Sequence, residues 1–272
     1  MKASALIGSL LAVLCVGVSA QADDKWEVAT SNCANDDTPA TCNQLIHGAR
    51  QTHDIQAVSS ARDQDWYVVE TKARRSYEAT LYNVSTVPNP GTAGLGTLMT
   101  RNDNAGGFLQ ASIGPDGPLN YGDDAGWLTL RWIGGAANAR ERVRVQGKAF
   151  GNPGPNDQYD IAFVDTTYDV ARFSNAGGQI TVFLIRNASP ATVAGNVYFY
   201  DTAGALLATV VLSVPVNGLQ VIITPTVPGL ANLAGSAAIA HTGGYGALSA
   251  KSVALEPSTG FSFDTPATVV PR

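Results

Sequence analysis

Short runs in which apolar and polar residues alternate recur along the whole chain, and turn-forming residues separate them. Alternation with a period of two is typical of a β-strand that buries one face, and Gly, Pro, Asn and Asp cluster between such runs. No long segment repeats its apolar residues at a helical spacing, so we predict an all-β protein. The predicted strands span residues 66–71, 77–84, 108–113, 127–133 and 140–146 in the first half, and 159–164, 168–173, 180–186, 196–201, 206–214, 219–224, 237–241 and 247–254 in the second.

A run made only of turn-forming residues, Gly-Asn-Pro-Gly-Pro-Asn at 151–156, predicts a linker. The charge content changes across it, because residues 21–153 carry 12 basic and 15 acidic side chains whereas residues 154–272 carry 4 and 7. Regular turn signals, as at 201–204 and 216–218, favour antiparallel sheets. We therefore expect two antiparallel β-sandwich domains. Their predicted bounds are residues 21–150 and 159–272, with a linker at 151–158.

The first 20 residues have the pattern of a secretory signal peptide. Lys2 precedes an apolar stretch at 5–18, and Val18-Ser19-Ala20 offers the small residues that signal peptidase reads. The stretch is shorter than the roughly 20 residues that a membrane-spanning helix needs. Leu14 before Cys15 is too bulky for a lipoprotein signal. We expect a secreted, extracellular or periplasmic protein with no membrane span.

Two cysteines, Cys33 and Cys42, follow the predicted signal and are separated by a short polar segment. In an oxidising compartment such a pair predicts a disulfide, which stabilises by roughly 2–3 kcal/mol through the unfolded chain. The alternative, a redox or metal pair, lacks Cys-x-x-Cys spacing and has only His47 nearby. We therefore predict a structural disulfide.

The first half resembles the bacterial pre-peptidase C-terminal domain family. The resemblance rests on Asp-Gln-Asp-Trp-Tyr-Val-Val at 63–69, Tyr-Glu-Ala-Thr-Leu at 77–81 and the strand Arg-Val-Arg-Val at 142–145, and it covers about residues 31–147. It implies a jelly-roll-like β-sandwich of the kind appended to secreted peptidases and collagenases. Such domains bind matrix, polysaccharide or their own enzyme rather than carry out chemistry.

The second half resembles an immunoglobulin-like module of uncharacterised secreted bacterial proteins. The resemblance rests on Asp-Thr-Thr-Tyr at 165–168, Arg-Phe-Ser-Asn at 172–175 and Thr-Val-Phe-Leu-Ile-Arg-Asn at 181–187. It implies a second β-sandwich and carries no function with it.

Carboxylates in loops are the clearest candidates for a metal site. Ca²⁺ accepts hard oxygen ligands from irregular loops, although turn and capping roles explain the same residues. For the pair at 63 and 65 we favour the structural role, in which each side chain bonds its own backbone at the start of a strand. We expect no cofactor, and calcium is the alternative. Its candidate ligands are Asp63, Asp65, Asp123 and Asp124.

Histidines are few, and their surroundings do not point to catalysis. His47 and His53 match no familiar zinc spacing, so we expect solvated loop histidines. His241-Thr-Gly-Gly, with Ser249 close behind, resembles an oxyanion segment, but the chain has no G-x-S-x-G elbow. We therefore predict a strand and turn there, and a protein that is not an enzyme.

One predicted sheet face concentrates arginines. Pairing 127–133 with 140–146 as a hairpin sets Leu130 opposite Val143 on the buried face, and alternation sends the arginines to the other face. Such a face could bind an acidic polysaccharide or protein through guanidinium contacts. The alternative is that these arginines are solvated or pair with nearby aspartates. The candidate ligand-binding residues are Trp127, Arg131, Arg140, Arg142 and Arg144.

Composition narrows the function only coarsely. The chain has 272 residues, 45% hydrophobic and 14% charged, and its net charge of −5 gives no electrostatic footprint for nucleic acid. We expect a secreted, non-catalytic binding or adhesion protein for extracellular polysaccharide or protein. The alternatives are an accessory subunit, a cryptic hydrolase or a structural component of the cell envelope.

Overall fold

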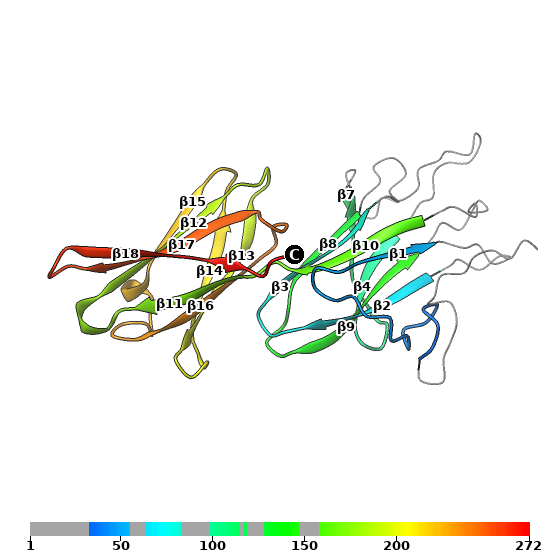
Figure 1. The fold of residues 1–272 in the computed structure, drawn as a ribbon, viewed down its shortest axis with the longest axis horizontal. Coiled ribbons are helices and arrows are strands. Elements are labelled where there is room, and N and C mark those ends of the chain that lie inside the picture. Colours follow the sequence, from blue (N-terminus) through cyan, green and yellow to red (C-terminus); the bar gives the residue numbers. More distant parts are fainter. Residues whose placement is uncertain (1–32, 55–63, 83–97, 115–116, 119–127, 147–157) are drawn as a thin grey trace, which may run out of the picture.

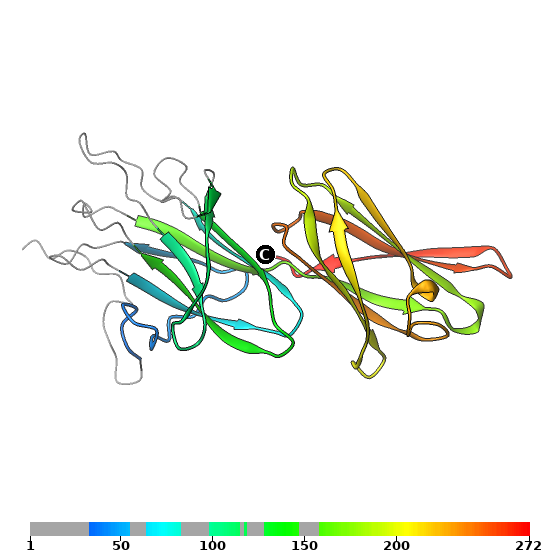
Figure 2. The same cartoon turned by 180° about the vertical axis from the view of Figure 1, so that it is seen from behind.

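The strands of the chain form four antiparallel sheets, which pack in pairs into two β-sandwiches. The two sandwiches lie end to end along the long axis of the molecule (Figure 1). The view from behind shows the same division (Figure 2). The predicted all-β, sandwich-type fold is therefore confirmed. The computed structural model describes residues 33–54, 64–82, 98–114, 117–118, 128–146 and 158–272.

The first sandwich contains β1 (Arg50–Asp54), β2 (Gln64–Thr71), β3 (Ser76–Tyr82), β4 (Leu98–Asn102), β5 (Phe108–Ala111), β6 (Ile113–Gly114), β7 (Gly117–Pro118), β8 (Leu128–Ile133), β9 (Ala139–Gln146) and β10 (Gln158–Asp165). One sheet has the order β1-β10-β3-β8-β6-β7 and the other the order β2-β9-β4-β5. The core lies between these two sheets.

Alternation along each strand builds this core. In β2, for example, Tyr67 and Val69 are fully buried between the sheets, and Val143 of the neighbouring strand β9 pairs with Tyr67 and points to the same face. Burying an aliphatic or aromatic side chain of this size contributes about 1.5–3 kcal/mol. The first core consists of Leu45, Tyr67, Val69, Tyr77, Ala79, Leu81, Met99, Leu128, Leu130, Trp132, Val143, Val145, Tyr159, Ile161 and Phe163.

The second sandwich contains β11 (Tyr168–Ser174), β12 (Ile180–Asn187), β13 (Val193–Asp201), β14 (Leu206–Val214), β15 (Leu219–Ile223), β16 (Ala234–His241), β17 (Leu248–Glu256), β18 (Phe261–Pro266) and β19 (Thr268–Val269), with short 3-10 turns at Ala176–Gly178 and Thr224–Thr226. Its sheets have the orders β14-β13-β16-β11-β19 and β15-β12-β17-β18. The β17–β18 hairpin extends beyond the sandwich, at the left of Figure 1.

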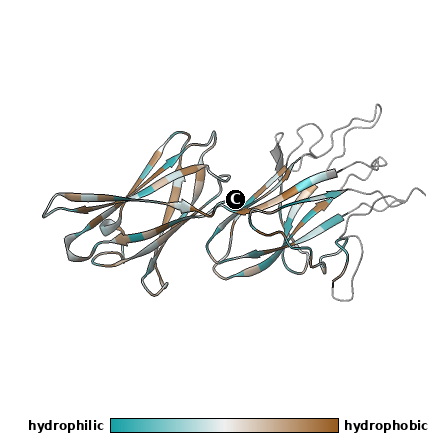
Figure 3. Ribbon diagram, in the orientation of Figure 1, coloured by the Kyte–Doolittle hydropathy of each residue, from teal (hydrophilic) through white to brown (hydrophobic). Residues whose placement is uncertain are grey.

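Three phenylalanines form the centre of the second core. Phe199 contacts Phe173 edge to face with ring centroids 5.4 Å apart, and Phe183 at 5.3 Å. Such aromatic pairs contribute about 0.5–1.5 kcal/mol beyond the area they bury. Hydrophobic segments lie along strands of both sandwiches (Figure 3), so each sandwich has its own core.

The boundary between the two sandwiches differs from the predicted one. The strand predicted at 159–164 was assigned to the second domain, but β10 pairs with β1 and β3 in the first sandwich. Ile161 and Phe163 of this strand complete the first core, which explains its placement. Only Thr166 and Thr167 separate β10 from β11, so the chain passes between the cores there. Of the predicted linker at 151–158, residues 151–157 lie outside the described part of the chain.

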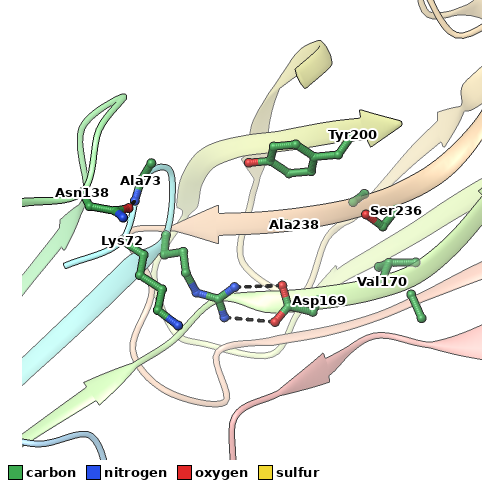
Figure 4. Close-up of a pocket in the computed structure, with 11 residues that line it drawn as sticks. Lys72, Ala73, Asn138, Asp169, Val170, Tyr200, Ser236 and Ala238 are labelled. Atoms are coloured by element: carbon green, nitrogen blue, oxygen red, sulfur yellow. Dashed lines mark hydrogen bonds and ion pairs between the residues drawn. The ribbon is translucent and has the colours of Figure 1, made fainter. Parts of the chain in front are cut away.

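An arginine joins the two sandwiches across this junction. The Arg75 guanidinium donates to Asp165 Oδ2 at 2.6 Å and to both carboxylate oxygens of Asp169 at 2.9 and 3.0 Å. Burial lowers the pKa of Arg75, but the hydrogen bonds to Asp169 and Asp165 outweigh it, and the pKa lies above its usual value. Figure 4 shows the contact to Asp169 beside a pocket of about 340 Å³ that Lys72 and Tyr200 also line.

The C-terminal residues also contact the first sandwich. The chain ends between the two sandwiches (Figure 1), where the Pro271 carbonyl lies 2.8 Å from His47 Nε2. The Arg272 guanidinium lies 3.5 Å from Glu78 Oε1 and stacks on the ring of Tyr245. The end of the second sandwich is thus held against the first by polar contacts.

The predicted disulfide is present. Cys33 and Cys42 are bonded, with their Cα atoms 5.6 Å apart. Within the described residues, no helix is long and apolar enough to cross a membrane. The predicted signal peptide at 1–20 lies outside those residues.

We expect Arg75→Met to loosen the junction. The substitution removes the two charge-assisted hydrogen bonds to Asp169 that cross between the sandwiches, and a third to Asp165 within the first sandwich, and it leaves the two carboxylates without their shared cation. Proteolytic cleavage near residues 164–168 should therefore accelerate. Limited proteolysis followed by mass spectrometry measures this. Arg101→Met is the matched control, because Arg101 makes a similar two-pronged contact to Glu141 inside the first sandwich. Equal cleavage at the junction in both variants would contradict a clamping role for Arg75.

Candidate functional site

A buried cluster of titratable side chains lies inside the first sandwich. Asp36 comes from the loop that the disulfide closes, His53 from β1 and Asp65 from β2, and each is at most 1% exposed. One ligand atom from each of the three side chains lies within 4.8 Å of the others. Tyr67 and Tyr159 complete the cluster. We call these five residues the Asp-His-Asp cluster.

The local structure fixes each member of the cluster. The Asp36 carbonyl accepts a hydrogen bond from Trp66 N at 2.7 Å, which holds the disulfide loop against the edge of β2. His53 lies directly opposite Tyr159 in the β1–β10 pair, and their rings stack with centroids 5.8 Å apart. Directly opposite residues point to the same face of a sheet, so both point inward.

The phenols of the cluster act as hydrogen-bond donors. Burial first, and then the Asp65 carboxylate, raise the pKa of Tyr159 well above its usual value. The Tyr159 phenol therefore keeps its proton and donates a hydrogen bond to Asp65 Oδ2. The Tyr67 hydroxyl lies 2.5 Å from the Tyr159 oxygen and donates to it in turn. This chain of donors stabilises the Asp65 carboxylate in a buried position.

The cluster corrects one sequence-based expectation and adds to another. Asp65 lies within β2, and its buried carboxylate accepts a hydrogen bond from Tyr159, a contact that the sequence did not indicate. His53 is not a solvated loop histidine, because it belongs to β1 and is 1% exposed. The polar sequence of β1 gave no strand signal, and nothing in the sequence linked His53 to Asp36. The remaining calcium candidates, Asp63, Asp123 and Asp124, lie outside the described residues.

The predicted arginine hairpin does not form. β8 pairs with β3, and β9 pairs with β2 and β4, so the two strands belong to different sheets of the first sandwich. Arg131 consequently lies opposite Glu78, not opposite Arg142. Alternation determines the face that a side chain occupies, but it does not determine the neighbouring strand, which explains the error. Trp127 lies outside the described residues.

Each arginine of the predicted face has a partner inside the protein. Arg131 Nε donates to Glu78 Oε2 at 2.7 Å, and Arg140 Nε lies 3.4 Å from Glu70 Oε1. Three arginines of β9 do share one face, as predicted, but the disulfide loop covers part of it. The Arg144 guanidinium lies over the ring of Trp66, with 5.4 Å from its central carbon to the ring centroid.

Arg142 is the most deeply placed of these arginines. It is 6% exposed and donates to the Thr41 carbonyl at 2.9 Å. Burial, and then the charge of Arg140, lower the pKa of Arg142 from its usual value. Ligand binding by this face stays a prediction. The arginines are not a row of solvated, like-charged neighbours, because each has a partner inside the protein.

The histidine and serine of the predicted turn near the end of the chain point in different directions. His241 ends β16 with an exposure of 0%, and its Nε2 lies 2.9 Å from the Thr166 carbonyl at the junction. Ser249 belongs to β17 and is exposed on the outer face of its sheet. The two side chains therefore do not form a nucleophile and base pair.

The outer face of the sheet β15-β12-β17 is apolar and exposed. The cross-strand pairs Val182–Ile223 and Leu184–Val221 place these side chains on the face away from the core. Val221 is 50% exposed. Strands about 4.8 Å apart and same-face residues about 6.8 Å apart give a patch of roughly 300 Å². We call it the apolar face. Its members are Ile180, Val182, Leu184, Leu219, Val221, Ile223, Val253 and Leu255.

Charges on the apolar face are few. The Lys251 ammonium contacts Asp264 Oδ2 at 2.5 Å, so these two charges compensate each other. Arg186, opposite Leu219, is exposed and has no ion pair with any described residue. The face therefore presents aliphatic surface with one uncompensated positive charge at its border.

No protein-family model matches the chain, and no characterised protein has a significantly similar sequence. The Asp-His-Asp cluster and the apolar face are the two features of the described residues that point to a function.

We expect His241 to make the protein less stable in acid. Burial lowers the pKa of His241 to about 4, whereas the unfolded chain has the ordinary value of about 6.5. The unfolded state therefore binds the proton more readily, and stability is lost as the pH falls from about 6.5 to about 4, by up to about 3 kcal/mol. Urea unfolding of the wild type and His241→Gln across this range measures the difference. The free energy of unfolding of the variant should vary less with pH; identical slopes would contradict the assignment.

Proposed function

We propose that the chain is an exported, non-catalytic binding protein whose second sandwich binds a partner protein through the apolar face. The apolar face is the single observation that carries this proposal. The largest contiguous apolar patch on a soluble monomer typically measures about 300–600 Å² and is often functional, and the apolar face is of this size. The predicted signal peptide and the disulfide support an extracytoplasmic location.

The chemistry of the apolar face favours a protein over a polysaccharide. All eight of its members are aliphatic, and none offers the aromatic stacking surface or polar groups that a sugar ring requires. Aliphatic surface is buried most favourably against the apolar surface of another protein. The resemblance of the first half to pre-peptidase C-terminal domains supports a binding role as well.

The positive charge of Arg186 indicates which kind of partner protein would fit the apolar face. Arg186 would lose its water on docking, and burying an unpaired charge is costly. A second copy of this chain would bring another Arg186, and the only carboxylate on the face, Asp264, already binds Lys251. We therefore expect a different protein that presents an apolar surface and a carboxylate opposite Arg186.

The size of the patch fits the centre of an interface. A stable interface covers about 800 Å² on each partner, with an apolar core and a polar rim. The roughly 300 Å² of the apolar face would form that core, and residues such as Ser249 and Arg186 its rim.

We expect Val221→Lys to weaken partner binding at least tenfold. The wild-type chain, immobilised, is used to capture proteins from the culture medium and envelope of the source cells. Each captured protein is identified, purified and titrated against the variants by isothermal calorimetry. A lysine at position 221 adds charge to the centre of the apolar face, and Arg186→Glu should weaken binding by reversing the border charge.

Val211→Lys is the matched control. Val211 is 72% exposed on β14, which belongs to the other sheet of the same sandwich, so its substitution should change the affinity less than twofold. A partner that binds Val221→Lys as tightly as the wild type contradicts the proposal. Binding of acidic polysaccharide alone, unaffected by Val221→Lys, also contradicts it.

A further inference from the structure

We propose that Asp36, His53 and Asp65 bind one divalent transition-metal ion of the zinc type, as a structural site inside the first sandwich. One ligand atom of each side chain lies within 4.8 Å of the other two. Two ligands of one zinc ion are at most about 4.2 Å apart, so small side-chain adjustments would bring all three atoms within reach of one ion. Two carboxylates and an imidazole are common zinc ligands. This site is independent of the apolar face, and neither proposal rests on the other.

The hydrogen bonds of Gln51 determine which imidazole nitrogen carries the proton. Gln51 Nε2 donates to the Gln44 carbonyl at 2.7 Å, which leaves Gln51 Oε1 as the atom that faces the histidine. His53 Nε2 lies 3.1 Å from this oxygen and must donate to it. In the neutral imidazole, His53 Nδ1 then has a lone pair, and it faces the Asp36 carboxylate. A metal-bound histidine typically donates its other N–H to an acceptor in this way.

The distance between Nδ1 and the carboxylate fits two ligands of one metal ion. His53 Nδ1 lies 3.6 Å from Asp36 Oδ2, which is too long for a hydrogen bond. Two ligand atoms that are each about 2.1 Å from a zinc ion at a tetrahedral angle lie about 3.4 Å apart. The lone pair and the anionic oxygen therefore fit around a cation better than they fit each other.

The third ligand is held by the donor chain of the cluster. The Tyr159 phenol donates to Asp65 Oδ2, and Tyr67 donates to Tyr159. Hydrogen bonds of this kind orient metal-binding carboxylates and are characteristic of the outer shell of a metal site. We assign Asp65 Oδ1 as the oxygen that would bind the ion.

The ligand set selects zinc over calcium. Ca²⁺ takes six to eight oxygen ligands, whereas Zn²⁺ favours four ligands and readily accepts imidazole nitrogen. Because the three side chains are at most 1% exposed, the ion would be sealed from substrates and its role would be structural. It would connect β1 and β2, which are edge strands of opposite sheets, to the disulfide loop that carries Asp36.

The test is a zinc titration of the full chain, without a histidine tag, after treatment with a strong chelator. Isothermal calorimetry and thermal melting should show one equivalent of Zn²⁺ bound and a melting temperature raised by several degrees. The same concentration of Ca²⁺ should produce neither effect. Substitution with Co²⁺ should give the visible absorption of a four-coordinate site.

Variants test whether the zinc ion binds at the Asp-His-Asp cluster. His53→Gln and Asp65→Asn should each abolish the cobalt absorption and the shift in melting temperature, and two different positions guard against a variant that fails to fold. Gln51→Leu should weaken zinc binding by 10- to 100-fold, because it removes the acceptor for His53 Nε2. His47→Gln is the matched control and should bind zinc as the wild type does, because His47 contacts Pro271 and not the cluster.

Three results would overturn the proposal. The first is a folded, chelator-treated wild type that binds no zinc, in which case a proton on His53 accounts for the cluster. The second is undiminished zinc binding by folded His53→Gln. The third is a response to Ca²⁺ and not to Zn²⁺.

Discussion

The structure depends on a connection of two residues, Thr166 and Thr167, between the last strand of the first sandwich and the first strand of the second. Both residues are fully buried, and both bond to the same residue of the first sandwich: Thr166 N donates to the Ser76 carbonyl and Ser76 N to Thr167 Oγ1, each at 2.8 Å. His241 contacts the Thr166 carbonyl from the second sandwich. The connection is short and its polar groups are bonded, and Arg75 adds a two-pronged ionic contact to Asp169 across it. These contacts oppose bending of the chain between the two sandwiches.

The strands could be predicted from the sequence, whereas their partners could not. All the predicted runs that lie in the described residues are strands, because alternation reports directly which residues a sheet buries. β1 was missed because its sequence, Arg-Gln-Thr-His-Asp, contains no apolar residue and its one inward side chain in the core is His53. β10 was predicted as a strand but placed in the wrong sandwich, because the turn-rich segment at 151–156 was a stronger local signal than the long-range pairing of β10 with β3. Which strands pair depends on how the whole core packs, and a local sequence pattern does not carry that information.

The members of the Asp-His-Asp cluster are also brought together only by long-range contacts of the fold. Asp36 precedes a proline-containing turn, His53 lies in a polar strand and Asp65 stands beside a tryptophan, so each residue has an ordinary local explanation. The disulfide and the backbone bond from Trp66 to Asp36 bring the first residue to the other two. Of these three residues, only Asp65 was a candidate metal ligand on sequence grounds, and the candidate ion was calcium. The imidazole that changes the preference toward zinc comes from β1, the strand that the sequence did not predict.

The arginines of the first sandwich and the apolar face of the second differ in how many of their contacts the protein itself provides. In a chain with only 14% charged residues, most charges at the surface of the first sandwich have found partners: Glu78 binds both Arg131 and Arg272, and Glu141 binds Arg101. A paired arginine has little left to offer a ligand, because binding an external anion would first require breaking an internal contact. The apolar face is the reverse case, since the aliphatic side chains of β15 are exposed, those of β12 are half-buried beside them, and Arg186 has no ionic partner among the described residues. A binding partner gains most from surface that makes few contacts within the protein. The apolar face is therefore a better candidate for binding than the arginines, although the arginines carry more charge.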